Sequence, residues 1–292
     1  MTILDELKQN KILLSDGALG TILQAKGMTP GECPELWNIT HRSDILDIAE
    51  SYLHAGSDII ETNSFGGSRI KLAQYGYGDR VAEFNQAAAT ISREAAGKNK
   101  HVAGSIGPTG KILLMGDVTE TELYDNFCEQ AIALEKGGAD IIIVETMSAL
   151  DEASLAVKAA SENTSCTIII TMTFSKDPQG KYFTMMGVSP SEMVISMKEA
   201  GAHIVGSNCG NGIEDMIGVV KEIRAVDNNI PVIIQANAGI PEFIDGKTFY
   251  RESPEMMASF VPQLLKAGVN IIGGCCGTTP EHIRQMGKAL GR

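Results

Sequence analysis

The sequence has few aromatic residues, few basic residues and no long hydrophobic run. Aromatic side chains make up 5% of the 292 residues, and 24 Lys and Arg stand against 36 Asp and Glu, which gives a formal net charge of −12. Such a surface repels a polyanion like nucleic acid unless a basic stripe is present, and the sequence has none. No apolar stretch reaches the roughly 18 residues of a membrane-spanning helix, and residues 1–10 lack the apolar core of a signal peptide. We therefore expect a cytoplasmic protein without nucleic-acid or membrane partners.

The sequence also lacks the cysteine pattern of a protein held together by disulfides. A chain of this length does not need cross-links to fold. Cys33, Cys128 and Cys166 stand alone, and we expect them to be small buried hydrophobic residues. Cys275 and Cys276 are adjacent in a glycine-rich segment, and clustered thiols in a reducing compartment indicate a metal site or reactive chemistry.

One short pattern occurs four times along the chain: the end of a helix, a glycine, and then an apolar strand. The copies are Ala55–Ile60, Gly137–Ile142, Ala200–Val205 and Ala267–Ile272. Glycine suits the position that ends a helix, and a β-branched run suits a strand that is buried on both faces. The glycines at 56, 138, 201 and 268 lie 82, 63 and 67 residues apart. Since one β/α unit takes about thirty residues, each interval is close to two units, with an insertion in the first.

The segments between these copies contain the remaining strands and several helix starts. Further strands are expected at 12–15, 101–105, 167–173 and 230–235. Helix starts are indicated by capping boxes at Thr119–Glu122 and Ser189–Glu192, and by Ser253-Pro254 and Thr279-Pro280. Eight alternating units without a linker predict one α/β domain over residues 1–292, a single (β/α)8 TIM barrel. An open doubly wound sheet is the alternative, because periodicity alone does not show that the sheet closes.

Polar residues follow the predicted strands, where a packed core would have apolar ones. The repeat copies end in Glu61-Thr62-Asn63, Glu145-Thr146, Asn208-Cys209 and Cys275-Cys276, and two other strands end in Asp16-Gly17 and Asn237-Ala238-Gly239. Catalytic groups of parallel barrels lie at the carboxyl ends of the strands, so these residues predict the position of the functional site. The methionines, including Met185 and Met186, are expected to be core residues instead.

Cys209, Cys275 and Cys276 are predicted to bind zinc and to form the catalytic centre. They follow the sixth and eighth strands, which only one strand separates at the barrel mouth. Three thiolates suit zinc and leave its fourth tetrahedral position open. A thiol substrate in that position loses its proton and stays nucleophilic, so this ligand set favours alkylation of a thiol. The alternative is two buried cysteines in a glycine-rich turn and one unrelated cysteine.

Taken together, the motifs resemble those of the homocysteine S-methyltransferase family. The matching segments are Asp16–Thr21, Glu61–Asn63, Gly107–Gly110, Glu145-Thr146, Asn208–Gly210, Asn237–Gly239 and Gly273–Gly277. They occur in the order of the family and extend over nearly the whole chain. Within the family, the chain is most similar to the homocysteine-binding module of cobalamin-dependent methionine synthase and less similar to betaine–homocysteine methyltransferase.

The resemblance implies how the substrate would bind. Zinc on the three cysteines would take the sulfur of homocysteine. Asp16 and Glu145 would bind the ammonium group of homocysteine, and backbone N–H groups around Gly17, Ala18 and Leu19 would bind its carboxylate. Both contacts are physically reasonable, because carboxylates pair with a cation and a tight glycine turn presents free amides to an anion.

The resemblance leaves other residues with less definite roles. Asn237 would occupy the zinc before the substrate arrives, although Gln235-Ala236 departs from the proline that usually precedes this motif in the family. Glu61, Asn63 and Asn208 are expected to line the mouth without an assigned role. Simpler alternatives are that Asp16 caps a helix, that Glu145 forms a structural ion pair, and that Asn237 only shapes its turn.

The methyl donor is the least determined part of the predicted reaction. The chain has no Asp-x-His-x-x-Gly corrinoid-binding motif. A separate methyl-corrinoid protein, which would carry methylcobalamin, is favoured over a small donor such as betaine or S-methylmethionine because of the similarity to the cobalamin-dependent module. A metal-free aldolase or isomerase and a non-catalytic thiol- or zinc-binding module are the alternatives from other classes.

Overall fold

Eight parallel strands form a closed barrel in the computed structural model, which describes residues 2–244 and 247–292. The strands are β1 (Leu13–Leu14), β2 (Ile59–Glu61), β3 (His101–Ile106), β4 (Ile141–Met147), β5 (Thr167–Met172), β8 (Ile204–Asn208), β9 (Val232–Ala236) and β12 (Ile271–Gly274). Their order is β1-β12-β9-β8-β5-β4-β3-β2, and a parallel bridge between Ser15 and Ile59 joins the two ends. The predicted (β/α)8 barrel is thus confirmed and the open sheet is excluded.

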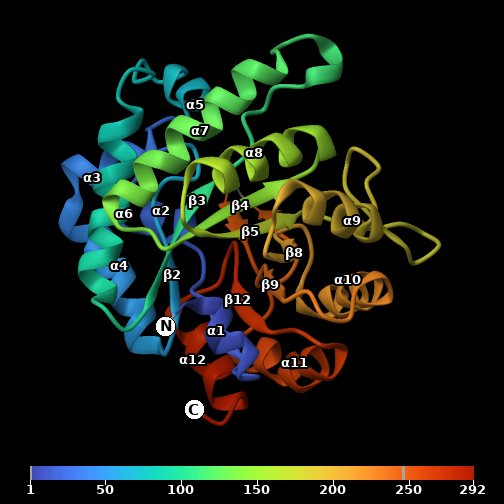
Figure 1. Ribbon diagram of the computed structural model, residues 1–292. Helices are drawn as coiled ribbons and strands as arrows, with labels where there is room; N and C mark the ends of the chain where they lie inside the picture. Colours follow the sequence, from blue (N-terminus) through green and yellow to red (C-terminus); the bar gives the residue numbers. More distant parts are fainter. Residues whose placement is uncertain (1, 245–246) are drawn as a thin grey trace.

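Helices surround the strands as an outer ring (Figure 1). They are α4 (Arg42–Ala55), α6 (Val81–Ala96), α7 (Glu120–Gly137), α8 (Leu150–Asn163), α9 (Pro190–Ala200), α10 (Ile213–Val226), α11 (Pro254–Ala267) and α12 (Pro280–Ala289). Each helix of the ring contacts the next one, and α12 contacts α4. No helix among the described residues is both long enough and apolar enough to cross a membrane.

The predicted helix boundaries agree with the structure. The repeat glycines end α4, α7, α9 and α11 in the left-handed conformation, with φ between 103° and 109°. The side chains of Thr119 and Ser189 form the predicted capping boxes, and Ser253 accepts a hydrogen bond from the amide of Met256. Thr279 also forms a capping box, in which His282 takes the place of the usual acid. The four further strands begin and end within two residues of their predicted limits.

The shorter elements lie outside this regular pattern. Helix α1 (Ile3–Lys8) precedes β1, and the others lie in loops at the carboxyl ends of strands. They are α2 (Gly20–Ala25), η1 (Pro34–Leu36), α3 (Trp37–Thr40), α5 (Arg69–Ala73), η2 (Leu113–Met115), the hairpin β6 (Ser175–Lys176) with β7 (Tyr182–Phe183), and the hairpin β10 (Glu242–Ile244) with β11 (Lys247–Phe249). The sequence did not predict the two hairpins.

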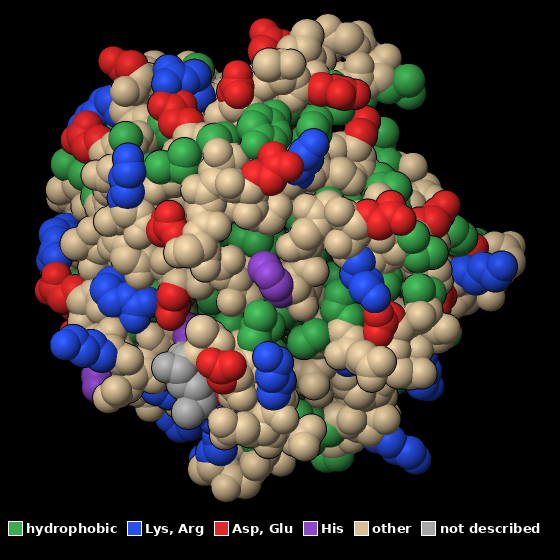
Figure 2. Space-filling model, viewed as in Figure 1, with side chains coloured by type: hydrophobic (Ala, Val, Ile, Leu, Met, Phe, Trp, Pro, Cys, Tyr) green, Lys and Arg blue, Asp and Glu red, His purple; other side chains and the backbone are tan. Residues whose placement is uncertain are grey.

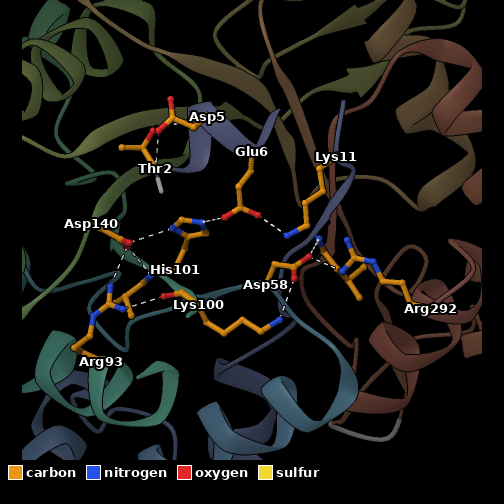
Figure 3. Close-up of polar contacts among 12 residues, drawn as sticks. Thr2, Asp5, Glu6, Lys11, Asp58, Arg93, Lys100, His101, Asp140 and Arg292 are labelled. Carbon is orange, nitrogen blue, oxygen red and sulfur yellow. Dashed lines mark hydrogen bonds and ion pairs between the residues drawn. The ribbon is translucent and has the colours of Figure 1, made fainter. Parts of the chain in front are cut away.

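Helix α1 closes the amino end of the barrel. Its buried Ile3 and Leu7 pack on the lower inward-facing layer of the strands, which consists of Leu13, Ile59, Ala103, Ile141, Ile143, Ile169, Ile204, Ile233 and Ile271. Around this contact, His101 Nε2 lies 2.8 Å from Glu6 Oε1, and its Nδ1 lies 3.1 Å from Asp140 Oδ2 (Figure 3). The apolar contact and the polar pairs together hold α1 on the barrel.

The same end of the molecule also anchors the carboxyl terminus. Asp58, which follows α4, is paired with Lys100 at 2.9 Å and with Arg292 (Figure 3). Acidic and basic side chains are interspersed over this face, and neither sign forms a block (Figure 2). The contacts at the amino end of the barrel therefore indicate a role in stabilising the fold.

Two residues beyond the apolar layer on which α1 packs, the inward-facing positions of the strands become polar. Successive inward-facing side chains of a strand are two residues apart. The second layer therefore contains Ser15, Glu61, Ser105, Glu145, Thr171 and Gln235, with Gly206 and Gly273 at the two remaining strands. Glycine is required at 206, since a Cβ there would lie 1.9 Å from the carbonyl oxygen of Ile233. An apolar floor thus supports a polar layer at the mouth.

Two predictions about buried residues are wrong. Met185 is 87% exposed and Met186 is also exposed, because both lie in the loop that leads from β7 to α9 at the barrel mouth and not on a strand or helix face. Cys128 is only partly buried on α7, whereas Cys33 and Cys166 are buried as expected.

Candidate active site

The cysteines predicted to bind zinc come together at the barrel mouth. The sulfur atoms of Cys209, Cys275 and Cys276 all lie within 4.8 Å of one another. Strand β9 holds both segments in place: the amide of Cys209 donates to the carbonyl of Gln235 at 3.1 Å, and that of Cys275 donates to the carbonyl of Ala236 at 2.7 Å. The backbone therefore fixes three sulfur atoms that come from two separate loops.

The geometry and charge of this cluster fit a zinc ion. Tetrahedral zinc with bonds of ~2.3 Å needs sulfur atoms about 3.8 Å apart, and the three sulfur atoms lie within 4.8 Å of one another. Hydrogen bonds from the thiols of Cys275 and Cys276 lower the pKa of Cys209 and concentrate negative charge on its sulfur. The side-chain NH2 of Asn237 donates a hydrogen bond to the same sulfur, and Oδ1 of Asn237 is buried and accepts no hydrogen bond from the described residues. A soft anionic cluster suits a bound cation.

A cavity of about 400 Å³ extends from the cysteines across the barrel mouth. Ten of the predicted site residues line it: Gly17, Ala18, Leu19, Glu61, Asn63, Glu145, Asn208, Cys209, Cys275 and Cys276. The other two, Asp16 and Asn237, are buried close behind the wall. The predicted residues therefore converge on one space, with two of them in supporting positions.

Three acidic side chains, those of Asp16, Glu61 and Glu145, lie together at the cavity. Burial raises the pKa of Asp16 and of Glu145 to about 7, and it raises that of Glu61 well above its ordinary value. Glu61 and Glu145 are close enough to share a proton. None of the three carboxyl groups has a basic partner within ion-pair distance among the described residues. Buried carboxyl groups without a partner suit a ligand that carries positive charge.

The structure does not support the simpler roles for Asp16 and Glu145. Asp16 does not cap α2, whose N-terminus has no side-chain cap. Its carboxylate instead accepts hydrogen bonds from the amide of Glu61 at 2.8 Å and from the hydroxyl of Ser15 at 3.2 Å. Glu145 accepts from the hydroxyl of Ser105 and from Nδ2 of Asn208, at 3.1 Å for the latter, and forms no ion pair.

Asn208 links the acidic residues to the cysteines. Its Nδ2 donates to Glu145 Oε2 and lies 3.9 Å from Cys275 Sγ, while its Oδ1 accepts from the amide of Thr146 at 2.9 Å. Thr146 has the left-handed φ of 61°, which is unusual for a β-branched residue. The side-chain amide of Asn208 thus holds the strained end of β4 and orients the carboxyl group of Glu145.

Gly17–Leu19 and Asn63 also line the cavity, and they differ in how many of their polar groups lack a hydrogen-bond partner. The backbone N–H of Ala18 donates to Thr278 Oγ1 at 3.0 Å, whereas those of Gly17 and Leu19 have no partner among the described residues. Asn63 uses its Nδ2 to hold the carbonyl of Pro34 at 2.7 Å. Asn63 therefore positions the loop before α3, and only its oxygen is left for the cavity.

Sequence reasoning missed two side chains that contact the site. Tyr250, from the loop before α11, donates a hydrogen bond to the sulfur of Cys276 and lies against Gly277, where a Cβ would be 2.2 Å from its ring. Gln235, at the end of β9, contacts Glu61 at 2.6 Å. Tyr250 lies in an irregular loop without a motif, so no sequence signal indicated it. Gln235 occupies an inward-facing position, which the alternation along β9 could have shown.

Comparisons with known proteins show the family to which the chain belongs. The family model described as homocysteine S-methyltransferase matches residues 13–290. The chain is 30% identical over 308 aligned residues to methionine synthase of Mycobacterium tuberculosis, and 29% identical to that of Mycobacterium leprae. These alignments cover 99% of the chain but only 25% of each relative, so the chain spans about a quarter of their length.

Solved structures show the same fold. The metallated form of the homocysteine methyltransferase MmuM from Escherichia coli superposes with a TM-score of 0.79 at 22% identity, and 96% of each chain is covered. The match to the family model extends from the first barrel strand to the last helix and includes all three cysteines. The chain therefore belongs to the homocysteine S-methyltransferase family, a family of methyltransferases.

Proposed function

We propose that this protein transfers a methyl group to the thiol of homocysteine and forms methionine, with zinc bound by Cys209, Cys275 and Cys276. The observation that carries the proposal is a single cavity whose wall contains three clustered thiols and the acids Glu61 and Glu145, with the third acid, Asp16, buried behind them. A zinc ion held there would bind the substrate sulfur as a thiolate and keep it nucleophilic. The unpaired Oδ1 of Asn237 is the protein oxygen that could occupy the metal before the substrate arrives.

The rest of the cavity suits the amino-acid end of homocysteine. The negative charge of Glu145, with Asp16 behind it, would stabilise the ammonium group. The free backbone N–H groups of Gly17 and Leu19 would bind the carboxylate. Asn208 orients the carboxyl group of Glu145 relative to the cysteines, so it sets the distance between the amine and thiol subsites.

The rim of the mouth favours a protein as the methyl donor. The loops after β3, β5 and β9 carry exposed apolar side chains, and Leu114, Met115, Met185, Ile240 and Phe243 are each more than 60% exposed. Exposed apolar residues on the loops around a functional opening are a feature of protein–protein contact sites. A separate methyl-corrinoid protein, docked on this rim, would present its methyl group to the cavity.

The proposal of a protein donor is tested by comparing methyl donors in variants of the rim residues. Leu114→Asp and Phe243→Asp should each slow transfer from a methyl-corrinoid protein by about tenfold or more. Both variants should leave transfer from free methylcobalamin unchanged. Ile195→Asp, which changes another exposed apolar residue on the outer face of α9, is the matched control. Turnover with betaine or S-methylmethionine as fast as with any corrinoid donor would contradict a protein donor.

A further inference from the structure

Gln235 occupies an unusual position for an uncharged side chain. It points into the barrel from the end of β9, directly above the apolar Ile233, and is only 2% exposed. Its Nε2 donates to Glu61 Oε1 at 2.6 Å and to Ser15 Oγ at 3.3 Å. Its Oε1 is buried and accepts no hydrogen bond from the described residues. A buried amide left half-satisfied beside a cavity indicates a role beyond packing.

The partner of Gln235 is one of the two acids that face the cavity. Glu61 and Glu145 line the cavity, whereas Asp16 does not. Asp16 accepts a hydrogen bond from the backbone amide of Glu61, so it fixes the backbone of this residue. Gln235 fixes the other end by its contact with the carboxyl group of Glu61. The side chain of Glu61 is thus held at both ends while it faces the cavity.

From this geometry we infer that Glu61 contacts the ammonium group of the substrate directly, and that Gln235 is a positioning residue that makes the site selective for thiols that carry an α-amine. The inference rests on the proposed function and adds a second carboxylate to Glu145 at the amine subsite. An ammonium group has three N–H donors, and one carboxylate satisfies them incompletely. Two carboxylates on one side of the cavity, with Asp16 behind them, provide the additional acceptors.

The test separates recognition of the amine from recognition of the thiol. Calorimetry on the zinc-loaded protein would compare L-homocysteine with 4-mercaptobutanoate, which has the same thiol and carboxylate but no amine. Gln235→Met should weaken L-homocysteine binding by about tenfold or more, as expected when a hydrogen bond to a charged group is lost. The same variant should change 4-mercaptobutanoate binding by less than about twofold, because zinc and the backbone N–H groups still bind it.

A double-mutant cycle shows whether Gln235 acts through Glu61. Glu61→Gln should cause the same loss for L-homocysteine alone, and the double variant should bind no worse than Glu61→Gln, because coupled residues are not additive. Gln130→Met is the matched control, since Gln130 is fully buried and also has an unpaired Oε1 but does not line the cavity. It should leave the ratio of the two dissociation constants unchanged.

Several outcomes would overturn the inference. Equal weakening of both ligands by Gln235→Met would show a merely structural role, and additive losses in the double variant would show that Gln235 does not act through Glu61. A change of the ratio in Gln130→Met would mean that any loosening of the barrel affects selectivity. Failure of the unaltered protein to bind either ligand would overturn the proposed function, and this inference with it.

Discussion

At the scale of single residues, the site is built from side chains whose environment changes their ordinary chemistry. Cys209 and Thr146 have left-handed φ values of 59° and 61°, a conformation that costs about 1–3 kcal/mol outside glycine. Cys209 follows β8 and contacts the other cysteines, and Thr146 lies near the end of β4 and contacts Asn208, so the fold maintains strain where the substrate would bind. The sequence indicated these residues by their position after the repeats, but not their conformation.

The limits of prediction at this scale have a physical cause. The cysteines and Glu145 lie at the ends of periodic strands, so a repeat was sufficient to bring them together. Tyr250 reaches Cys276 from an irregular loop whose path no periodicity determines. The hydrogen bond of Ala18 to Thr278, 260 residues away in the chain, depends on closure of the barrel and was equally invisible.

The acidic cluster predicts how homocysteine binding depends on pH. The pKa of Asp16 and of Glu145 is about 7, so both carboxyl groups lose charge as the pH falls below that value. Since the ammonium group of homocysteine pairs with the ionised form, its affinity should fall below pH 7 by up to about tenfold per pH unit for each carboxyl group that must be ionised. Calorimetric titration between pH 5.5 and pH 8.5, with 4-mercaptobutanoate as reference, measures this effect. Parallel pH profiles for the two ligands would contradict it.

At the scale of elements, the repeat determined the architecture and the irregular loops determined the details. The glycines that end α4, α7, α9 and α11 have the predicted left-handed conformation. The spacing of these repeats along the chain was enough to place the eight strands. The hairpins β6–β7 and β10–β11 are too short to produce a periodic signal. They are insertions at the mouth, and loops of this kind vary without changing the barrel.

Close packing between neighbouring strands makes Gly206 essential. A Cβ at this position would lie 1.9 Å from the carbonyl oxygen of Ile233, so Gly206→Ala should lower the free energy of unfolding by about 3 kcal/mol, the upper end of the usual cost of overpacking. Urea denaturation measures the change. Gly287→Ala on α12 is the control, because its nearest neighbour would be the flexible end of Leu14 at 3.4 Å. It should be neutral or stabilising by up to about 1 kcal/mol. Equal effects of the two variants would contradict the packing argument.

The attachment of α1 predicts a pH-dependent stability. Burial lowers the pKa of His101, but its hydrogen bonds to Asp140 and Glu6 outweigh burial and raise the pKa above its ordinary value of 6.5. The stabilisation is therefore complete below pH 6.5 and is lost as the pH rises through the higher folded-state pKa. His101→Gln should cost more free energy of unfolding at pH 6 than at pH 9. A cost that is the same at both pH values, or larger at pH 9, would show that the charge of His101 does not hold α1.

At the scale of the whole molecule, the two ends of the barrel have different tasks. The amino end carries the apolar plug of α1 and the ion pairs of Asp58, which bind both chain termini to the barrel. The carboxyl end carries the cysteines, the acids and the exposed apolar rim. Barrels of this kind separate stability from function in the same way, since loops at the carboxyl end vary without disturbing the strands.

The most direct test of the account is whether methyl transfer to homocysteine depends on zinc at the three cysteines. Two quantities would be measured: the formation of methionine from homocysteine and free methylcobalamin, and the amount of bound zinc. Both would be compared between the unaltered protein, the zinc-stripped protein, Cys276→Ser and Cys128→Ser. Cys128 is a partly exposed cysteine on α7 and is the matched control. We predict that zinc removal and Cys276→Ser each abolish both zinc binding and methionine formation, whereas Cys128→Ser retains both. Methionine formation by the zinc-stripped protein, or full zinc content and activity in Cys276→Ser, would contradict the account.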